Sequence, residues 1–218
     1  MTQRRGWGRR QTHPHVSCRS ERPTMPRWVR SGSTPRDAAS FRENGGVRAL
    51  LLMDVDGPLN PYEAPWFLQQ TPAPGYAFHE LTPAGGVTYR VALNPEHGQE
   101  LLRMAGSFDL AWATTWLHDA NRLISPLLGL ATNLPVVPLV QPRFHHGSRS
   151  WKAEQIADWV RDRPFAWFDD EVNRATRQWL DSQERLGRHL AHRVEPHLGL
   201  MLADFDALLS FADGLGAH

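Results

Sequence analysis

Apolar residues in this chain fall into two kinds of run, which predict two kinds of secondary structure. Residues 47–56 form a short apolar run that ends in acidic residues, as is typical of a parallel strand buried on both faces. Further strands are predicted at residues 108–113, 134–140 and 165–168. Helices are predicted at residues 95–105, 117–128, 151–161, 171–188 and 202–212, some with a clear apolar face.

The order of these elements predicts the fold class. Strands and helices alternate between residues 47 and 188, which predicts an open α/β sheet. Polar and acidic residues follow the predicted strands, and ligands of such sheets bind outside the carboxyl ends of the strands. Residues 75–93 alternate in polarity around a Pro-Ala-Gly-Gly turn at residues 83–86, and we expect a β-hairpin there.

The first 45 residues have a different composition. They are rich in Arg, Ser, Thr, Pro and Gly, and their apolar residues show no period, so residues 1–45 are expected to form a disordered basic extension. This segment carries ten Arg and three acidic residues, a net charge of +7, whereas residues 46–218 carry a net charge of −6. Three interpretations stay open: a basic arm for nucleic acid, a transit peptide, or a dispensable extension.

Composition limits the other classes. A hydrophobic content of 41% and a charged content of 22% are ordinary for a globular protein, and no run approaches the roughly 18 apolar residues of a membrane span. Cys18 is the only cysteine, which excludes an intrachain disulfide and fits a reducing, cytoplasmic setting. The chain has 23 Arg and a single lysine, Lys152. This bias favours a GC-rich, bacterial genome, and it singles out the one ammonium group.

Paired acidic residues at strand ends are the first indication of chemistry. Asp54 and Asp56 lie two positions apart at the end of the first strand. Carboxylates this close repel one another, so a cation is expected beside them. Mg²⁺ prefers oxygen ligands and is commonly held by one or two carboxylates together with phosphate. A carboxylate can also act as a nucleophile and form an aspartyl-phosphate.

Four segments carry a resemblance to a known family. They are Asp54-Val55-Asp56-Gly57-Pro58-Leu59-Asn60-Pro61, Ala111-Trp112-Ala113-Thr114-Thr115, Lys152 at a helix start, and Phe165-Ala166-Trp167-Phe168-Asp169-Asp170. In this order they resemble motifs one to four of the haloacid-dehalogenase-like (HAD) superfamily, over about residues 46–213. The resemblance implies a three-layer Rossmann-like core in residues 46–218, with a central parallel sheet and a small β-hairpin flap after the first strand.

The resemblance also implies roles for the residues of the first two motifs. Asp54 is expected to be the nucleophile that attacks phosphorus. Asp56 is expected to protonate the leaving oxygen and then to activate water. Thr114 is expected to bind a phosphoryl oxygen, with Thr115 as the alternative, and Gly57 is expected to lie at the substrate.

The remaining motifs imply the charge-stabilising groups. Lys152 is expected to neutralise charge on the transferring phosphoryl group, as a compact ammonium that Arg does not replace. Mg²⁺ is expected on the Asp54 carboxylate, the Asp56 backbone carbonyl and Asp170. Asp169 is then expected to bond a metal-bound water or to orient Lys152. Together these groups stabilise an in-line phosphoryl transfer electrostatically.

The spacing of the motifs bears on the substrate. Only about 35 residues separate motifs one and two beyond a helix and a strand, so the chain is expected to be nearly capless. In this superfamily an open site tends to accept large substrates. The leading prediction is a Mg²⁺-dependent phosphatase whose phosphorylated substrate is small or macromolecular, with nucleic acid left open. The alternatives are a nucleic-acid end-processing phosphotransferase, and a HAD-fold binding protein with little turnover, because Pro58 occupies the turn beside the nucleophile.

Overall fold

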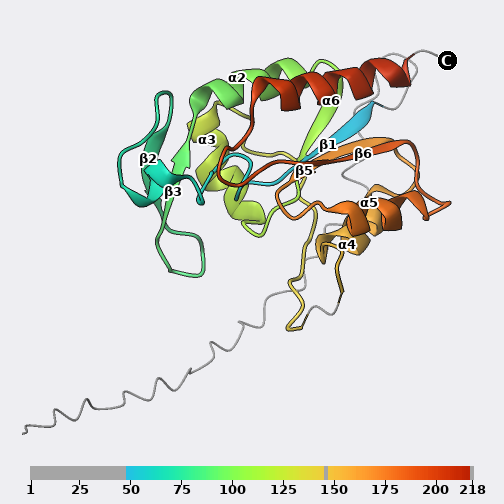
Figure 1. The fold of residues 1–218 in the computed structure, drawn as a ribbon, viewed down its shortest axis with the longest axis horizontal. Helices are drawn as coiled ribbons and strands as arrows, with labels where there is room; N and C mark the ends of the chain where they lie inside the picture. The colour runs from blue at the N-terminus through green and yellow to red at the C-terminus, as the bar shows by residue number, and fades with distance from the viewer. Residues whose placement is uncertain (1–47, 145–146, 217–218) are drawn as a thin grey trace, which may run out of the picture.

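The computed structural model describes residues 48–144 and 147–216 and contains two separate sheets (Figure 1). The larger sheet has four parallel strands in the order β4-β1-β5-β6. Its strands are β1 (Ala49–Met53), β4 (Phe108–Trp112), β5 (Phe165–Asp169) and β6 (His189–Arg193). The smaller sheet is an antiparallel hairpin of β2 (Ala77–Leu81) and β3 (Tyr89–Leu93).

Helices cover both faces of the parallel sheet and give three layers (Figure 1). One face carries α2 (Pro95–Met104), the π-helical turn η2 (Ala120–Ile124), α3 (Ser125–Leu128) and α6 (Leu202–Leu215). The other face carries α4 (Lys152–Val160) and α5 (Arg174–Asp181), and the short α1 (Pro65–Leu68) precedes the hairpin.

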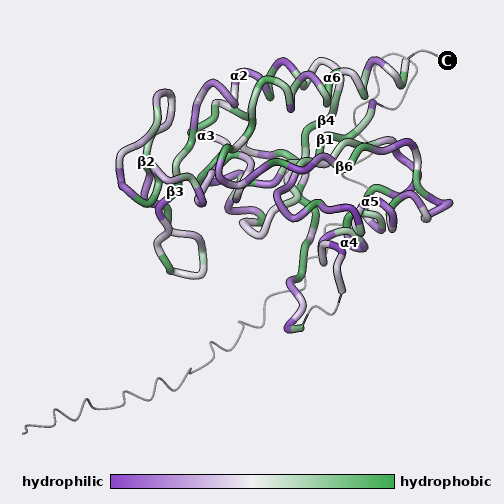
Figure 2. The backbone as a smooth tube through the Cα atoms, viewed as in Figure 1, coloured by the Kyte–Doolittle hydropathy of each residue, from purple (hydrophilic) through white to green (hydrophobic). Residues whose placement is uncertain are grey.

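The two faces of β1 supply separate halves of the core. Leu51 and Met53 pack into the cluster beneath α2 and α6, whereas Leu50 and Leu52 pack into the cluster beneath α4. All five residues of β1 are buried, as a central parallel strand requires. Figure 2 shows hydrophobic residues along this strand, whereas the loops around α4 and α5 are largely hydrophilic.

Strand register brings the motif residues to one edge of the sheet. Met53 is paired with Trp112 on one side and with Phe168 on the other. The residues that follow Met53 and Trp112, and Asp169 at the end of β5, therefore lie together at the carboxyl edge. The hairpin β2-β3 lies at this end of the sheet (Figure 1), so it is placed to flank a site there.

Most predicted elements are confirmed. The structure has the predicted α/β class, the parallel sheet and the hairpin. It also has the predicted strands at residues 108–113 and 165–168 and the helices that begin near residues 95, 151 and 202. Asn94 caps α2 as its side chain accepts a hydrogen bond from the backbone N–H of Glu96 at 3.0 Å.

Three details of the prediction are wrong. The segment at residues 134–140 forms only an isolated bridge from Val136 to Trp112, because Pro135 and Pro138 have no N–H for a ladder. The helix predicted at residues 171–188 spans only Arg174–Asp181, and β6 follows it. The helix α1 was not predicted. The helix predicted at residues 117–128 is confirmed, because residues 118–128 are helical throughout, with the π-helical η2 between two α-helical ends.

The extension predicted at residues 1–45 lies outside the described residues. Among the helices of residues 48–144 and 147–216, none has the length and apolar character needed to cross a bilayer.

Candidate active site

The only lysine of the chain joins two buried carboxylates at the carboxyl edge of the sheet. Lys152 Nζ lies 2.7 Å from Asp54 Oδ2 and 2.7 Å from Asp169 Oδ2. The three side chains are 4%, 4% and 0% exposed. Burial alone would lower the pKa of Lys152, but the negative charges of Asp54 and Asp169 raise it above its ordinary value. The ammonium therefore stays charged beside the predicted nucleophile.

Asp54 occupies the position directly after β1. Its Oδ1 accepts a hydrogen bond from the backbone N–H of Val55 at 2.8 Å, and its Oδ2 accepts from Lys152. The backbone N–H of Asp54 itself continues the ladder to the carbonyl of Phe168 at 3.2 Å. The carboxylate is thus held by the end of β1 and by the start of α4.

Asp56 is held by two side-chain donors. Asn60 Nδ2 donates to Oδ1 and Trp116 Nε1 donates to Oδ2, each at 2.9 Å. Burial raises the pKa of Asp56, and the nearby charge of Asp54 raises it further, whereas the two donors lower it. The net pKa lies above the ordinary value, which suits a carboxyl that has to carry a proton.

Asp169 and Asp170 face different partners. Asp169 Oδ2 accepts from Lys152 and from Trp167 Nε1 at 3.2 Å, and its Oδ1 accepts from the backbone N–H of Glu171 at 2.8 Å. Asp170 lines the cavity and accepts a hydrogen bond from the Tyr62 hydroxyl at 2.9 Å. Burial raises the pKa of Asp170 to about 6.

A group of three carboxylates fits a divalent cation. One oxygen each of Asp54, Asp169 and Asp170 lies within 4.8 Å of the others, and Mg²⁺ prefers such hard oxygen donors. Asp169 already accepts three hydrogen bonds, so Asp54 and Asp170 have the oxygens best placed to bind a cation at the cavity.

Gly57 lies against this group in a conformation that favours glycine. Its φ is +87°, and a Cβ built there would lie 2.6 Å from Asp170 Cβ. The glycine thus allows the backbone after Asp56 to approach Asp170 closely.

The two threonines that follow β4 differ in exposure. Thr114 is 0% exposed, and its Oγ1 accepts a hydrogen bond from the backbone N–H of Trp116 at 3.4 Å. Thr115 is exposed and lines the cavity. Both threonines lie at the carboxyl edge of the sheet. Of the two, only Thr115 lines the cavity above this edge.

A cavity of about 1090 Å³ opens over these groups. Its floor contains Asp54, Asp56, Lys152 and Asp170, and the hairpin supplies part of its wall. The lining also includes the acids Asp119 and Glu171 and these aromatic and basic side chains: Tyr62, Phe67, Tyr89, Arg90, Trp116, His118, Arg122 and Trp151.

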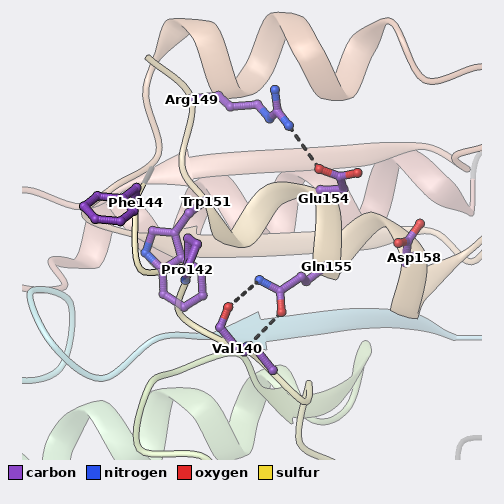
Figure 3. Close-up of a pocket in the computed structure, with 8 residues that line it drawn as sticks. All are labelled: Val140, Pro142, Phe144, Arg149, Trp151, Glu154, Gln155 and Asp158. Carbon is purple, nitrogen blue, oxygen red and sulfur yellow. Dashed lines mark hydrogen bonds and ion pairs between the residues drawn. The ribbon is translucent and has the colours of Figure 1, made fainter. Parts of the chain in front are cut away.

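A smaller cavity of about 390 Å³ also has Trp151 in its lining (Figure 3). In its wall, the side chain of Gln155 forms two hydrogen bonds with the backbone of Val140. Its Oε1 accepts from the Val140 N–H at 2.7 Å, and its Nε2 donates to the Val140 carbonyl at 3.2 Å. Figure 3 also shows the ion pair between Arg149 and Glu154 at its rim. Trp151, directly before α4, is therefore shared by the two cavities.

Three residues that contact Asp56 or Asp170 could not be assigned these contacts from the sequence. The sequence marks Asn60 only as part of motif one, and it does not predict the contacts of Tyr62 and Trp116. Asn60 and Tyr62 follow Asp56 by four and six positions, so proximity to the motif was the one available signal. The indole bond of Trp116 depends on the pairing of β1 with β4.

Comparison with known proteins gives a family match. Residues 50–205 match the family model described as the HAD domain in Swiss Army Knife RNA repair proteins. No curated protein and no solved structure matches the chain. The match covers more than half of the 218 residues and agrees with the motif order and the three-layer core. The chain therefore belongs to the family of HAD domains found in Swiss Army Knife RNA repair proteins.

Proposed function

We propose that this chain is a Mg²⁺-dependent phosphatase that removes a terminal phosphate from RNA through an aspartyl-phosphate on Asp54. Family membership supports a HAD-fold hydrolase or phosphotransferase. The single observation that carries the finer proposal is the convergence of Asp54, Asp56, Lys152 and Asp170 on one cavity floor. A nucleophile, an acid, a fixed cation and a metal ligand are the parts that phosphoryl transfer needs.

The first step uses Asp54 and Asp56. An oxygen of the Asp54 carboxylate forms a bond to phosphorus while the bond from phosphorus to the leaving oxygen breaks. Asp56 gives its proton to that leaving oxygen, so that an alcohol departs and not an alkoxide. The raised pKa of Asp56 favours the protonated carboxyl that this step requires.

The second step restores the site. The ionised Asp56 now accepts a proton from water, whose oxygen attacks phosphorus while the bond to Asp54 breaks. Inorganic phosphate leaves and both carboxyl groups return to their starting states. Lys152 remains an ammonium throughout and balances the negative charge that gathers around Asp54.

The metal is assigned to Asp54 and Asp170, with the Asp56 backbone carbonyl as a third ligand. Bound there, Mg²⁺ supplies further positive charge for the phosphoryl oxygens. Asp169 orients Lys152 through their 2.7 Å contact. Thr115 is assigned to a phosphoryl oxygen because it lines the cavity, with Thr114 as the buried alternative.

Two observations support RNA as the substrate. The family description names RNA repair proteins. The cavity wall combines Phe67, Tyr89 and Trp151 with Arg90 and Arg122, and single-stranded nucleic acid is commonly bound by aromatic stacking together with cationic groups. The cavity volume of about 1090 Å³ suits the end of a polymer.

The test is phosphate release by the full chain from RNA oligonucleotides with a 3′-phosphate or a 5′-phosphate. Small phosphate esters are measured in parallel, each with Mg²⁺ or EDTA. The proposal predicts Mg²⁺-dependent release from one RNA end, at a rate above that for the small esters. Release from small esters alone would contradict the RNA assignment. No release from any substrate would favour a binding protein with the HAD fold.

A further inference from the structure

The carboxyl group of Asp56 is clamped at both oxygens by donors from two separate elements. Asn60 Nδ2 reaches Oδ1 from the turn after β1, and Trp116 Nε1 reaches Oδ2 from the segment after β4, both at 2.9 Å. Neither the indole N–H nor the amide NH₂ accepts hydrogen bonds. Two fixed donors on the two oxygens define the plane of the carboxyl group and restrict its rotation.

Both donors are themselves immobilised. Asn60 is 4% exposed, and its Oδ1 accepts from the backbone N–H of Ala92 in β3 at 2.9 Å. Its amide therefore bridges the hairpin and Asp56. Trp116 is 9% exposed, and its backbone N–H is bonded to Thr114 Oγ1. Its ring meets that of Tyr89 edge-on, with a centroid distance of 5.9 Å.

We infer that Trp116 and Asn60 are positioning residues for the proton transfer, because they aim the Asp56 carboxyl at the leaving oxygen. This inference rests on the proposed function of Asp56. The two donors occupy one lone pair of each oxygen, and the proton that Asp56 transfers occupies a remaining one. The hydrogen bond from Asp56 to the leaving oxygen then forms without a search through other rotamers, which lowers the barrier of the step.

A packing role for Trp116 makes a different prediction. Loss of packing would slow every substrate alike, because it disturbs the whole site. Loss of the correct orientation of the Asp56 carboxyl group slows only those substrates whose leaving group must be protonated. An RNA end with its phosphate on oxygen releases an alkoxide unless it is protonated, whereas the same end with a bridging sulfur releases a stable thiolate. The ratio of the two rates isolates the proton transfer.

The experiment compares kcat and KM of the full chain for these two substrates, at whichever RNA end the wild-type chain dephosphorylates. Trp116→Phe keeps an aromatic ring and removes the N–H. We expect it to lower kcat for the oxygen substrate by about 10- to 100-fold, to leave KM nearly unchanged, and to change the rate for the sulfur substrate by less than about 3-fold. Asn60→Asp keeps an acceptor for Ala92 N–H but replaces the amide donor by a second carboxyl group, which competes for the proton of Asp56, and it is expected to show the same selectivity.

The matched control is Trp112→Phe. It also removes a buried indole donor, which is bonded to Ser125 Oγ at 3.3 Å and does not touch Asp56. It is expected to leave the ratio of the two rates unchanged. Thermal unfolding of each variant establishes that it is folded, and Asn60→Asp carries the test if Trp116→Phe does not fold.

The outcomes separate the inference from the function on which it rests. An equal loss on both substrates in Trp116→Phe and Asn60→Asp, with an active wild-type chain, would overturn the positioning role and leave the phosphatase proposal intact. Absence of turnover by the wild-type chain on either substrate would overturn the proposed function and the inference with it.

Discussion

Nζ of Lys152 lies 2.7 Å from Oδ2 of Asp54, and each side chain is only 4% exposed. This contact connects the start of α4 to the end of β1. Removing two charges from water is costly, and their attraction offsets that cost only with close geometry and further hydrogen bonds. A second 2.7 Å contact from Lys152 to Asp169 completes the arrangement, so the single lysine is paired with two buried carboxylates.

Removal of this ammonium is predicted to destabilise the fold as well as to abolish catalysis. Lys152→Met leaves two buried carboxylates without their partner, which typically costs about 3–5 kcal/mol. Urea unfolding of both proteins measures the difference. The control Arg185→Met removes an exposed partner of Asp158 and is expected to cost less than about 1 kcal/mol. Equal stability of Lys152→Met and wild type would show that the contact is not an ionised pair.

Gly57 is predicted to be irreplaceable for a steric reason beyond its backbone angle. In Gly57→Ala the new Cβ would lie 2.6 Å from Asp170 Cβ, at a φ of +87°. Gly129→Ala has a similar strain, at a φ of +70°, but no atom lies within 4 Å of its Cβ. Gly129→Ala is expected to lose about 1–2 kcal/mol of stability, and Gly57→Ala is expected to lose more because of the contact with Asp170; urea unfolding measures both. Only Gly57→Ala is expected to lose activity by more than about 10-fold, and parallel losses in both variants would contradict this.

The core of the site could be predicted from the sequence because its residues follow strands that the apolar pattern marks. Asp54 and Asp169 occupy strand ends, and the parallel sheet brings them together. The contacts of Trp116 and Tyr62 could not be predicted, because each joins segments that are distant in the chain. They depend on strand register and on side-chain direction.

The missed fold elements have equally local causes. The sequence of β6, His-Leu-Ala-His-Arg, is largely polar because this edge strand pairs only with β5. It therefore lacks the continuous apolar run of β1. At residues 134–140 a strand was predicted that does not form. The run is apolar, but Pro135 and Pro138 have no N–H and prevent a hydrogen-bonded ladder.

His97 is predicted to make stability fall in acid. Burial lowers the pKa of His97 from 6.5 to about 4, an effect that the Leu200 backbone and the charge of Asp204 only partly offset. Above pH 6.5 the ring is neutral in both states. Between pH 6.5 and about 4 the unfolded chain takes up the proton first, so the free energy of unfolding decreases as pH falls.

The comparison of wild type with His97→Gln isolates this effect. From pH 7 to pH 4, wild type is expected to lose about 2–3 kcal/mol more than the variant. Urea unfolding at a series of pH values gives both curves. Parallel curves would mean that His97 is protonated in the folded state as readily as in the unfolded chain.

Mg²⁺ is predicted to stabilise the chain through Asp170. The cation would relieve the repulsion within the group of Asp54, Asp169 and Asp170, and any ligand that binds only the folded state raises its stability. In wild type and in the control Asp158→Asn, an exposed position on α4, we expect an increase in melting temperature with added Mg²⁺. Asp170→Asn is expected to lose most of that increase. A full increase in Asp170→Asn would place the metal elsewhere.

The most direct test of the central claim is detection of the covalent phosphate on Asp54. The full chain is mixed with Mg²⁺ and an RNA end that carries radioactive phosphate, and the reaction is quenched in acid within milliseconds. The account predicts label on the peptide that contains Asp54, release of that label by hydroxylamine, and no label in Asp54→Asn. Phosphate release by the wild-type chain without any labelled peptide, or undiminished release by Asp54→Asn, would contradict it.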